Sequence, residues 1–293
     1  MSDTAAALRR KIGSAGDLQS VVRSMKALAA SSIGQYENSV RSLGDYYRTV
    51  ELGLSACFRE RGSTTEIAAA ARAHSVSAIV FGSDQGLVGQ FNANIVDYAV
   101  KALAAMPAKA KVWAVGERVH ARLADAGLAP LGLLALPNSV EAIAPLVGQL
   151  QIESETQGQH SDTMSLWVFY NRPLPGALYQ PAGQRLLPLD ALWQRNLAKI
   201  PWPSVDLPEV LGTGITTLQA LVREYMFISL FRACAESLAS ENASRLAAMQ
   251  RADKTIDDLL DSLRAESNRL RQSSIDEELF DVIAGFEALA GAA

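Results

Sequence analysis

The sequence predicts a mixed α/β protein: a long antiparallel coiled coil of N- and C-terminal helices, with a Rossmann-like, doubly wound α/β domain inserted between them. Residues 207–288 contain no proline after Pro208, and apolar residues recur there every three or four positions, the spacing of one helical face. Residues 8–58 share both features. Between these stretches, short β-branched runs alternate with helical patterns, which is typical of a parallel sheet. We expect parts at residues 1–60, 61–206 and 207–293.

The C-terminal pattern is too long for a compact domain. A continuous helix over it would measure roughly 120 Å, whereas a chain of this length should fold to a body only about 50 Å across. We therefore expect this helix to project and to bury its apolar stripe against a partner.

The N-terminal pattern supplies that partner. Its apolar positions follow a heptad rhythm, which is typical of a coiled coil, and its roughly 75 Å also exceed a compact body. The first 26 residues hold more basic than acidic side chains, and the end of the C-terminal helix is rich in Asp and Glu. Opposite charge and small seam residues favour pairing of the two helices as one shaft.

The middle of the chain alternates between strand and helix. We expect strands near residues 76–82, 111–115, 128–136 and 163–170, with helices over 91–106, 117–126 and 139–151. Seven prolines between residues 173 and 208 exclude a long helix there, and we expect this segment to return the chain across the body.

Composition and charge argue against several classes of protein. A net charge of −4 argues against nucleic-acid binding, which needs a basic face. The apolar runs are too short to span a bilayer, and residues 1–11 lack the apolar core of a signal peptide, so we expect a cytoplasmic protein. Cys57 and Cys234 fall in predicted helices and are interpreted as buried thiols.

The loop at residues 82–89 reads GSDQGLVG and follows the first strand, where such sheets bind ligands. It matches neither the dinucleotide nor the phosphate-loop spacing, and it is not a nucleophile elbow. Asp84 is a candidate general base, but a turn aspartate that accepts backbone N–H bonds is the favoured interpretation. The three histidines show no metal-ligand spacing. We expect no catalytic residue, metal or cofactor.

Four motifs resemble the γ subunit of F-type ATP synthases, the central rotor shaft. The most specific, ASENASRLAAM at residues 239–249 and NRLRQSSIDEEL at 268–279, are similar to the family's ASExxARMxAM and to its YNKARQAxITxEL/I. VVRSMKALAA at 21–30 resembles ITKAMKMVAA, and SDQGLVGQFN at 83–92 resembles SDRGLCGGFN. The resemblance covers nearly the whole chain.

The sequence departs from these motifs in places. Gln85, Val88 and Gln90 replace the family's Arg, Cys and Gly, Ser32 stands where a Lys is usual, and Ser267 replaces a Tyr. These departures suggest a divergent, alternate bacterial F-type ATPase.

The resemblance implies a function and partners. The chain would be a non-catalytic subunit that transmits torque between a membrane-embedded c-ring and the nucleotide sites on a ring of three α and three β subunits, for ATP synthesis or ATP-driven ion transport. The two helices would lie in the bore of that ring, and the α/β domain would contact the ε subunit and the c-ring. The chain would sit peripherally on the cytoplasmic face of the bacterial plasma membrane, held there only through the complex.

The motif match also implies two contact surfaces. The torque contact with β would use Arg23, Met25, Lys26, Asn268, Arg269, Arg271 and Gln272, whose arginines can form charge-assisted bonds with carboxylates. An apolar bearing at the top of the ring would use Leu279, Val282, Ile283 and Phe286.

Two other interpretations stay open on the residues alone. One is a coiled-coil scaffold or adaptor without a rotary role. The other is an α/β enzyme with helical arms that acts through Asp84.

Overall fold

The structure, a computed structural model, describes residues 2–61, 75–106, 108–158, 164–174, 177–189, 191–206, 208–209 and 214–290. Its elements are α1 (Ser2–Ser42), α2 (Gly44–Arg61), β1 (Ser75–Phe81), α4 (Phe91–Ala104), β2 (Ala110–Val115), α5 (Glu117–Asp125), β3 (Gly132–Leu134), α6 (Ile143–Gly158), β4 (Met164–Leu174), β5 (Ala177–Leu187), α7 (Ala191–Ala198) and α8 (Ile215–Ala290). The described residues form two compact units. The first takes them from Met1–Leu28 and Leu246–Ala293, and the second from Ala29–Arg245.

The two terminal helices largely follow the prediction. Helix α8 has 76 residues, but it begins at Ile215 and not at residue 207; residues 207 and 210–213 lie outside the described part. The single helix predicted over residues 8–58 is two helices, because Leu43 forms a turn and α2 starts at Gly44. Glycine is unfavourable inside a helix, which fits a break at this point. The division at residues 60 and 206 remains a prediction.

Helix α1 buries every seventh residue: Leu8, Ala15, Val22, Ala29 and Tyr36. This strict repeat is the pattern of a coiled coil. Within the first unit, Gln19 of α1 bonds to Asp257 of α8, whereas Lys26 bonds to Asp253. Numbers rise along one helix as they fall along the other, so the predicted antiparallel pairing is confirmed.

The second unit contains a five-stranded sheet of order β3-β2-β1-β4-β5. Strands β1 to β4 pair in parallel, as the alternation of strand and helix predicted. The sheet is not wholly parallel, because β5 runs antiparallel to β4.

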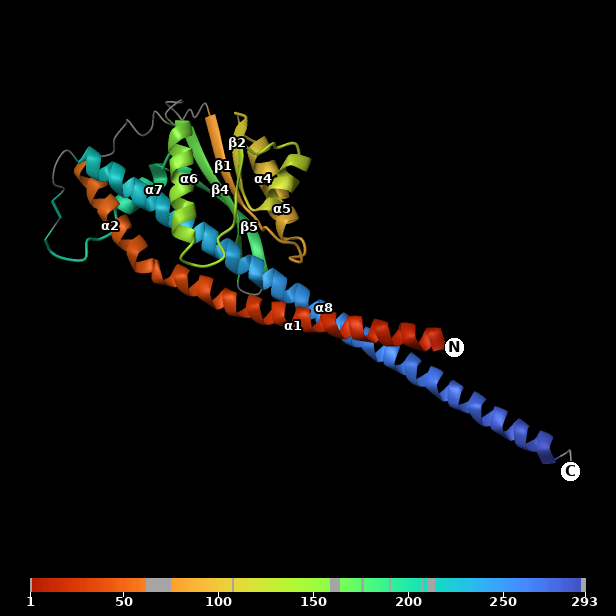
Figure 1. The fold of residues 1–293 in the computed structure, drawn as a ribbon. Helices are drawn as coiled ribbons and strands as arrows, with labels where there is room; N and C mark the ends of the chain where they lie inside the picture. The colour runs from red at the N-terminus through yellow and green to blue at the C-terminus, as the bar shows by residue number, and fades with distance from the viewer. Residues whose placement is uncertain are drawn as a thin grey trace. The chain divides into compact units, whose positions relative to one another are not determined.

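Helices cover both faces of this sheet (Figure 1). On one face, α6 and α8 pack against inward residues such as Ile79, Phe81 and Val168. On the other, α4 and α5 pack against Val76, Ala78 and Val80 and their neighbours. Because β1 contributes alternate residues to both cores, it lies buried at the centre of the unit, and the doubly wound domain is confirmed.

Strand β5 corrects the interpretation of the proline-rich segment. It spans 11 residues and includes Pro181, which lies opposite Asn171 of β4. Proline is tolerated in an edge strand, whose outer N–H groups need no partner, and β5 is at the sheet's edge. Two other boundaries were wrong: the third strand covers only Gly132–Leu134, and α6 occupies Ile143–Gly158.

Candidate functional site

The basic residues predicted for torque contact lie on α1 in the first unit. The Arg23 Nε lies 3.1 Å from Asp253 Oδ1, and the Lys26 Nζ lies 3.1 Å from Asp253 Oδ2. The side chains of Arg23 and Lys26 remain 57% and 40% exposed, so both are held from within the chain and still open to a partner. Met25 is half-buried and packs on the small apolar core of this unit.

Asp253 is the acceptor of this cluster, and its side chain is only 14% exposed. Donation from Lys26 lowers the pKa of the Asp253 carboxyl, and Arg23 adds to the effect. The pairing therefore stabilises the ionised carboxylate more than burial opposes it.

The second predicted group, on α8, is exposed along its whole length: Asn268, Arg269, Arg271 and Gln272. Within the described part of the chain, no hydrogen bond or ion pair engages these four side chains. Their donors are available to groups outside the chain.

The predicted bearing residues are also exposed. Leu279, Val282 and Ile283 are 56%, 70% and 44% exposed, while the side chain of Phe286 lies outside the described part. Ile275 and Phe280 are exposed beside them, and the motif match had not included these two. So much apolar surface on one helix end is typical of an interaction surface.

A further apolar stripe on α1 was missed. Leu18, Val21 and Leu28 are all more than half exposed, and their spacing of three and seven places them on one side of the helix. Only the heptad rhythm of this helix had been predicted. The signal was in the sequence, because these residues stand just outside the seven-residue series that α8 covers.

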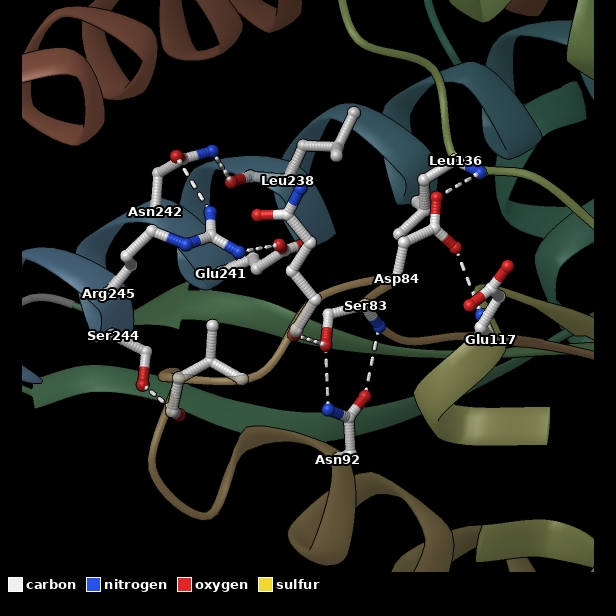
Figure 2. Close-up of polar contacts among 12 residues, drawn as sticks. Ser83, Asp84, Asn92, Glu117, Leu136, Leu238, Glu241, Asn242, Ser244 and Arg245 are labelled. Carbon is white, nitrogen blue, oxygen red and sulfur yellow. Dashed lines mark hydrogen bonds and ion pairs between the residues drawn. The ribbon is translucent and has the colours of Figure 1, made fainter. Parts of the chain in front are cut away.

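The loop after β1 in the second unit is fixed by backbone bonds to Asp84. Its Oδ1 accepts from the N–H of Glu117 at 2.9 Å and its Oδ2 from that of Leu136 at 3.1 Å (Figure 2). Glu117 is the first residue of α5, where a helix presents free N–H groups. Each carboxylate oxygen thus accepts a backbone N–H bond, which confirms the interpretation of Asp84 as a loop aspartate bonded to backbone N–H groups.

The same loop docks on α8. The Ser244 hydroxyl donates to the carbonyl of Val88 at 2.6 Å, and Val88 is almost fully buried. Asn92, at the start of α4, bonds to Ser83 through both its amide atoms, as Figure 2 shows. The loop therefore forms a structural joint between the sheet and α8.

Glu241 and Arg245 form an ion pair on α8 beside this joint (Figure 2). Their side chains are 7% and 13% exposed. Burial raises the pKa of the Glu241 carboxyl, and Arg245 opposes that shift only in part. Here desolvation outweighs pairing.

Comparisons with known proteins agree with this architecture. A family model described as ATP synthase matches residues 4–289. The chain belongs to the ATP synthase gamma-chain family. The ATP synthase gamma chain of Syntrophus aciditrophicus is 26% identical, with 97% of each chain covered.

Chains in solved ATP synthases share the fold of this chain. A chain in the OSCP/F1/c-ring structure of the Euglena gracilis mitochondrial enzyme gives a TM-score of 0.66 at 16% identity and covers 99% of this chain and 95% of its own. A chain in the central stalk/c-ring structure of the Tetrahymena thermophila enzyme gives 0.56 at 22% identity, over 79% of this chain and 99% of its own. Among the described residues of this gamma-family chain, no helix has the length and hydropathy of a membrane span.

Proposed function

We propose that this gamma-family chain is the central-stalk rotor of an F-type ATP synthase and transmits torque between a membrane ion-driven c-ring and the catalytic sites of an α3β3 ring. The observation that carries the proposal is the end of α8, where donors and apolar side chains follow one another without partners in the described chain. An exposed surface of this kind is typical of a contact with another protein. A rotor in the bore of a ring has that cover on all sides.

Torque contact would use two kinds of group side by side on α1. Arg23 and Lys26 can form charge-assisted bonds with carboxylates on β, and the exposed Leu18, Val21 and Leu28 can pack against apolar walls of the bore. On α8, Asn268, Arg269, Arg271 and Gln272 would complete the contact. Charged bonds at these sites can be exchanged between successive β subunits, because each is partly open to water and therefore weak alone.

The bearing would be the exposed apolar end of α8. Leu279, Val282, Ile283 and Phe286 would turn against an apolar collar at the top of the ring, with Ile275 and Phe280 extending that surface. Apolar contact suits a bearing because it is not directional, so it resists rotation less than hydrogen bonds would.

The chain itself would be non-catalytic. Asp84 is engaged by two backbone N–H groups, and nucleotide chemistry would stay on β. The α/β domain would contact the ε subunit and the c-ring, and the chain would sit peripherally at the cytoplasmic face of the bacterial inner membrane through those contacts.

Reconstitution with purified α and β subunits tests the proposal. We expect a 3:3:1 complex whose ATP hydrolysis depends on this chain. A variant with Leu279, Val282 and Ile283 changed to Ser should assemble less well, whereas serine at Leu131 and Leu133, also exposed, should have no effect. Failure of a stoichiometric complex to form would contradict the rotor proposal and favour a coiled-coil scaffold.

A further inference from the structure

The pairing of α1 with α8 in the first unit contains a polar layer. In α1, Ala15 and Val22 belong to the buried seven-residue series. Four positions after its members, Ile12, Gln19 and Lys26 form a second series that is buried or partly buried. In α8, Met249 and Ile256 form one such series, and Asp253 and Leu260 form the other. Gln19, Lys26 and Asp253 therefore occupy seam positions that a coiled coil normally fills with apolar residues.

These three polar residues meet one another across the seam. Asp253 accepts from Lys26 at 3.1 Å and from Gln19 at 3.4 Å, and Gln19 also bonds to Asp257. Arg23 lies at the exposed edge of this layer. Its guanidinium nitrogens lie 3.1 Å from Asp253 Oδ1 and 3.6 Å from Asp257 Oδ1. Each donor of the layer lies on α1 and each carboxylate on α8.

The apolar contacts nearby include several alanines. The buried apolar residues of this cluster are Ala15, Val22, Met249, Ile256 and Leu260, with Ile12, Met25, Ala248 and Ala252 packed against them, and the three alanines contribute little area to a seam. A polar group at a seam position is a well-attested way in which helix pairs fix their alignment at some cost in stability.

We propose that Gln19, Lys26 and Asp253 are the alignment lock of the helix pair, with Asp253 as its organising residue. Gln19 and Lys26 of the lock, together with Arg23 outside it, lie on α1 and all donate to Asp253 of α8, so only one alignment of α1 on α8 satisfies all three donors. Asp253 is a positioning residue: it also holds Arg23 and Lys26 at the surface proposed for torque contact. The lock itself needs no partner subunit, so it can be tested apart from the rotor proposal.

The test measures the distance between α1 and α8 in the full-length chain by pulsed electron paramagnetic resonance. Spin labels are placed at Ser24→Cys and Lys254→Cys, which are exposed positions of the first unit; the native Cys57 and Cys234 are buried and should not react. Asp253→Lys puts a third cation among Arg23 and Lys26, so we expect a longer and broader distance distribution.

Two further variants make the result specific. Asp258→Lys reverses an exposed charge on the next turn of α8 and should keep the native distribution. Lys26→Asp combined with Asp253→Lys restores opposite charges across the seam and should return the narrow native distance. If Asp253→Lys prevents folding and the double variant folds with the native distance, the lock is likewise supported. Equal distributions for Asp253→Lys and Asp258→Lys, or no rescue by the double variant, would overturn it.

Discussion

In two charge clusters on α8, the surroundings shift the pKa of the carboxyl group in opposite directions. In the first unit, Asp253 lies between Lys26 and Arg23 at a seam that water reaches, and its pKa is lowered. In the second unit, Glu241 is paired with Arg245 but is deeply buried, and its pKa is raised. Pairing outweighs desolvation in the first case and loses to it in the second.

The two clusters therefore have different roles along α8. The seam charges pair α1 with α8 while Arg23 and Lys26 stay partly exposed, whereas the buried pair lies beside the contact between α8 and the loop after β1. The two units can be followed independently, because Trp113, Trp167, Trp193 and Trp202, all the tryptophans of the chain, lie in the second.

The largest effect is expected from breaking the buried pair. Arg245→Leu leaves Glu241 without its cation and should lower the free energy of unfolding of the second unit by about 3 kcal/mol at neutral pH. Tryptophan fluorescence during urea unfolding measures it. Replacing both partners, Arg245→Leu with Glu241→Met, should recover most of that loss. A double variant as unstable as the single one would show that the pair is a net source of stability.

The joint can be tested without changing charge. Gly116 has φ of 115°, and a Cβ there would lie 2.9 Å from the Ser83 backbone, so Gly116→Ala should cost about 2 kcal/mol or more. Gly127 also has positive φ, 82°, but open space around it. Gly127→Ala should therefore cost about 1 kcal/mol from the backbone alone. Equal losses in urea unfolding would mean that the loop does not pack as tightly as described.

A smaller effect is expected from the bond that ties the loop to α8. Ser244→Ala removes the donor to the Val88 carbonyl and should cost about 1 kcal/mol. Ser240 is equally buried, but its hydroxyl has no partner among the described residues. Ser240→Ala should be neutral or slightly stabilising in the same assay, and a loss equal to that of Ser244→Ala would contradict the role of the bond.

The smallest expected effect is that of acid, which should change the stability contributions of the two clusters in opposite directions. Asp253 has a lowered folded pKa, so its contribution is present above its unfolded value of about 3.9 and is lost as pH falls through the folded pKa. Glu241 has a raised folded pKa, so its ionisation destabilises the second unit at neutral pH, and this cost is relieved as pH falls through that raised pKa.

Distances between labels at positions 24 and 254 report the first unit, and tryptophan fluorescence reports the second. Between neutral pH and pH 3, we expect Asp253→Asn to weaken the response of the first signal and Glu241→Gln that of the second. If either variant altered the other unit's response, the two clusters would not be independent.

Much of the fold followed from the sequence because its signals are local. The apolar spacing of three and four residues from Val22 onward and the β-branched run before Gly82 each specify an element from residues close together in sequence. Strand β5 could not be predicted in this way. Its Pro181 argues against a strand unless the strand is known to be at an edge, and edge position is a property of the folded sheet.

The site was only partly predictable for a similar reason. Motif resemblance selected Arg23 and Lys26, but their acceptor Asp253 depends on the alignment of two helices distant in sequence. The interpretation of Asp84 as an acceptor of backbone N–H bonds was correct, but its donors, Glu117 and Leu136, lie far along the chain and could not be identified from its own loop.

Single-molecule observation of the assembled complex tests the rotor proposal most directly. With the α3β3 ring fixed to a surface and a bead attached to the α/β domain of this chain, addition of ATP should produce rotation in one direction, with pauses that divide each turn into three. A stoichiometric complex that hydrolyses ATP while the bead shows only random motion would contradict the central-stalk function proposed for this chain.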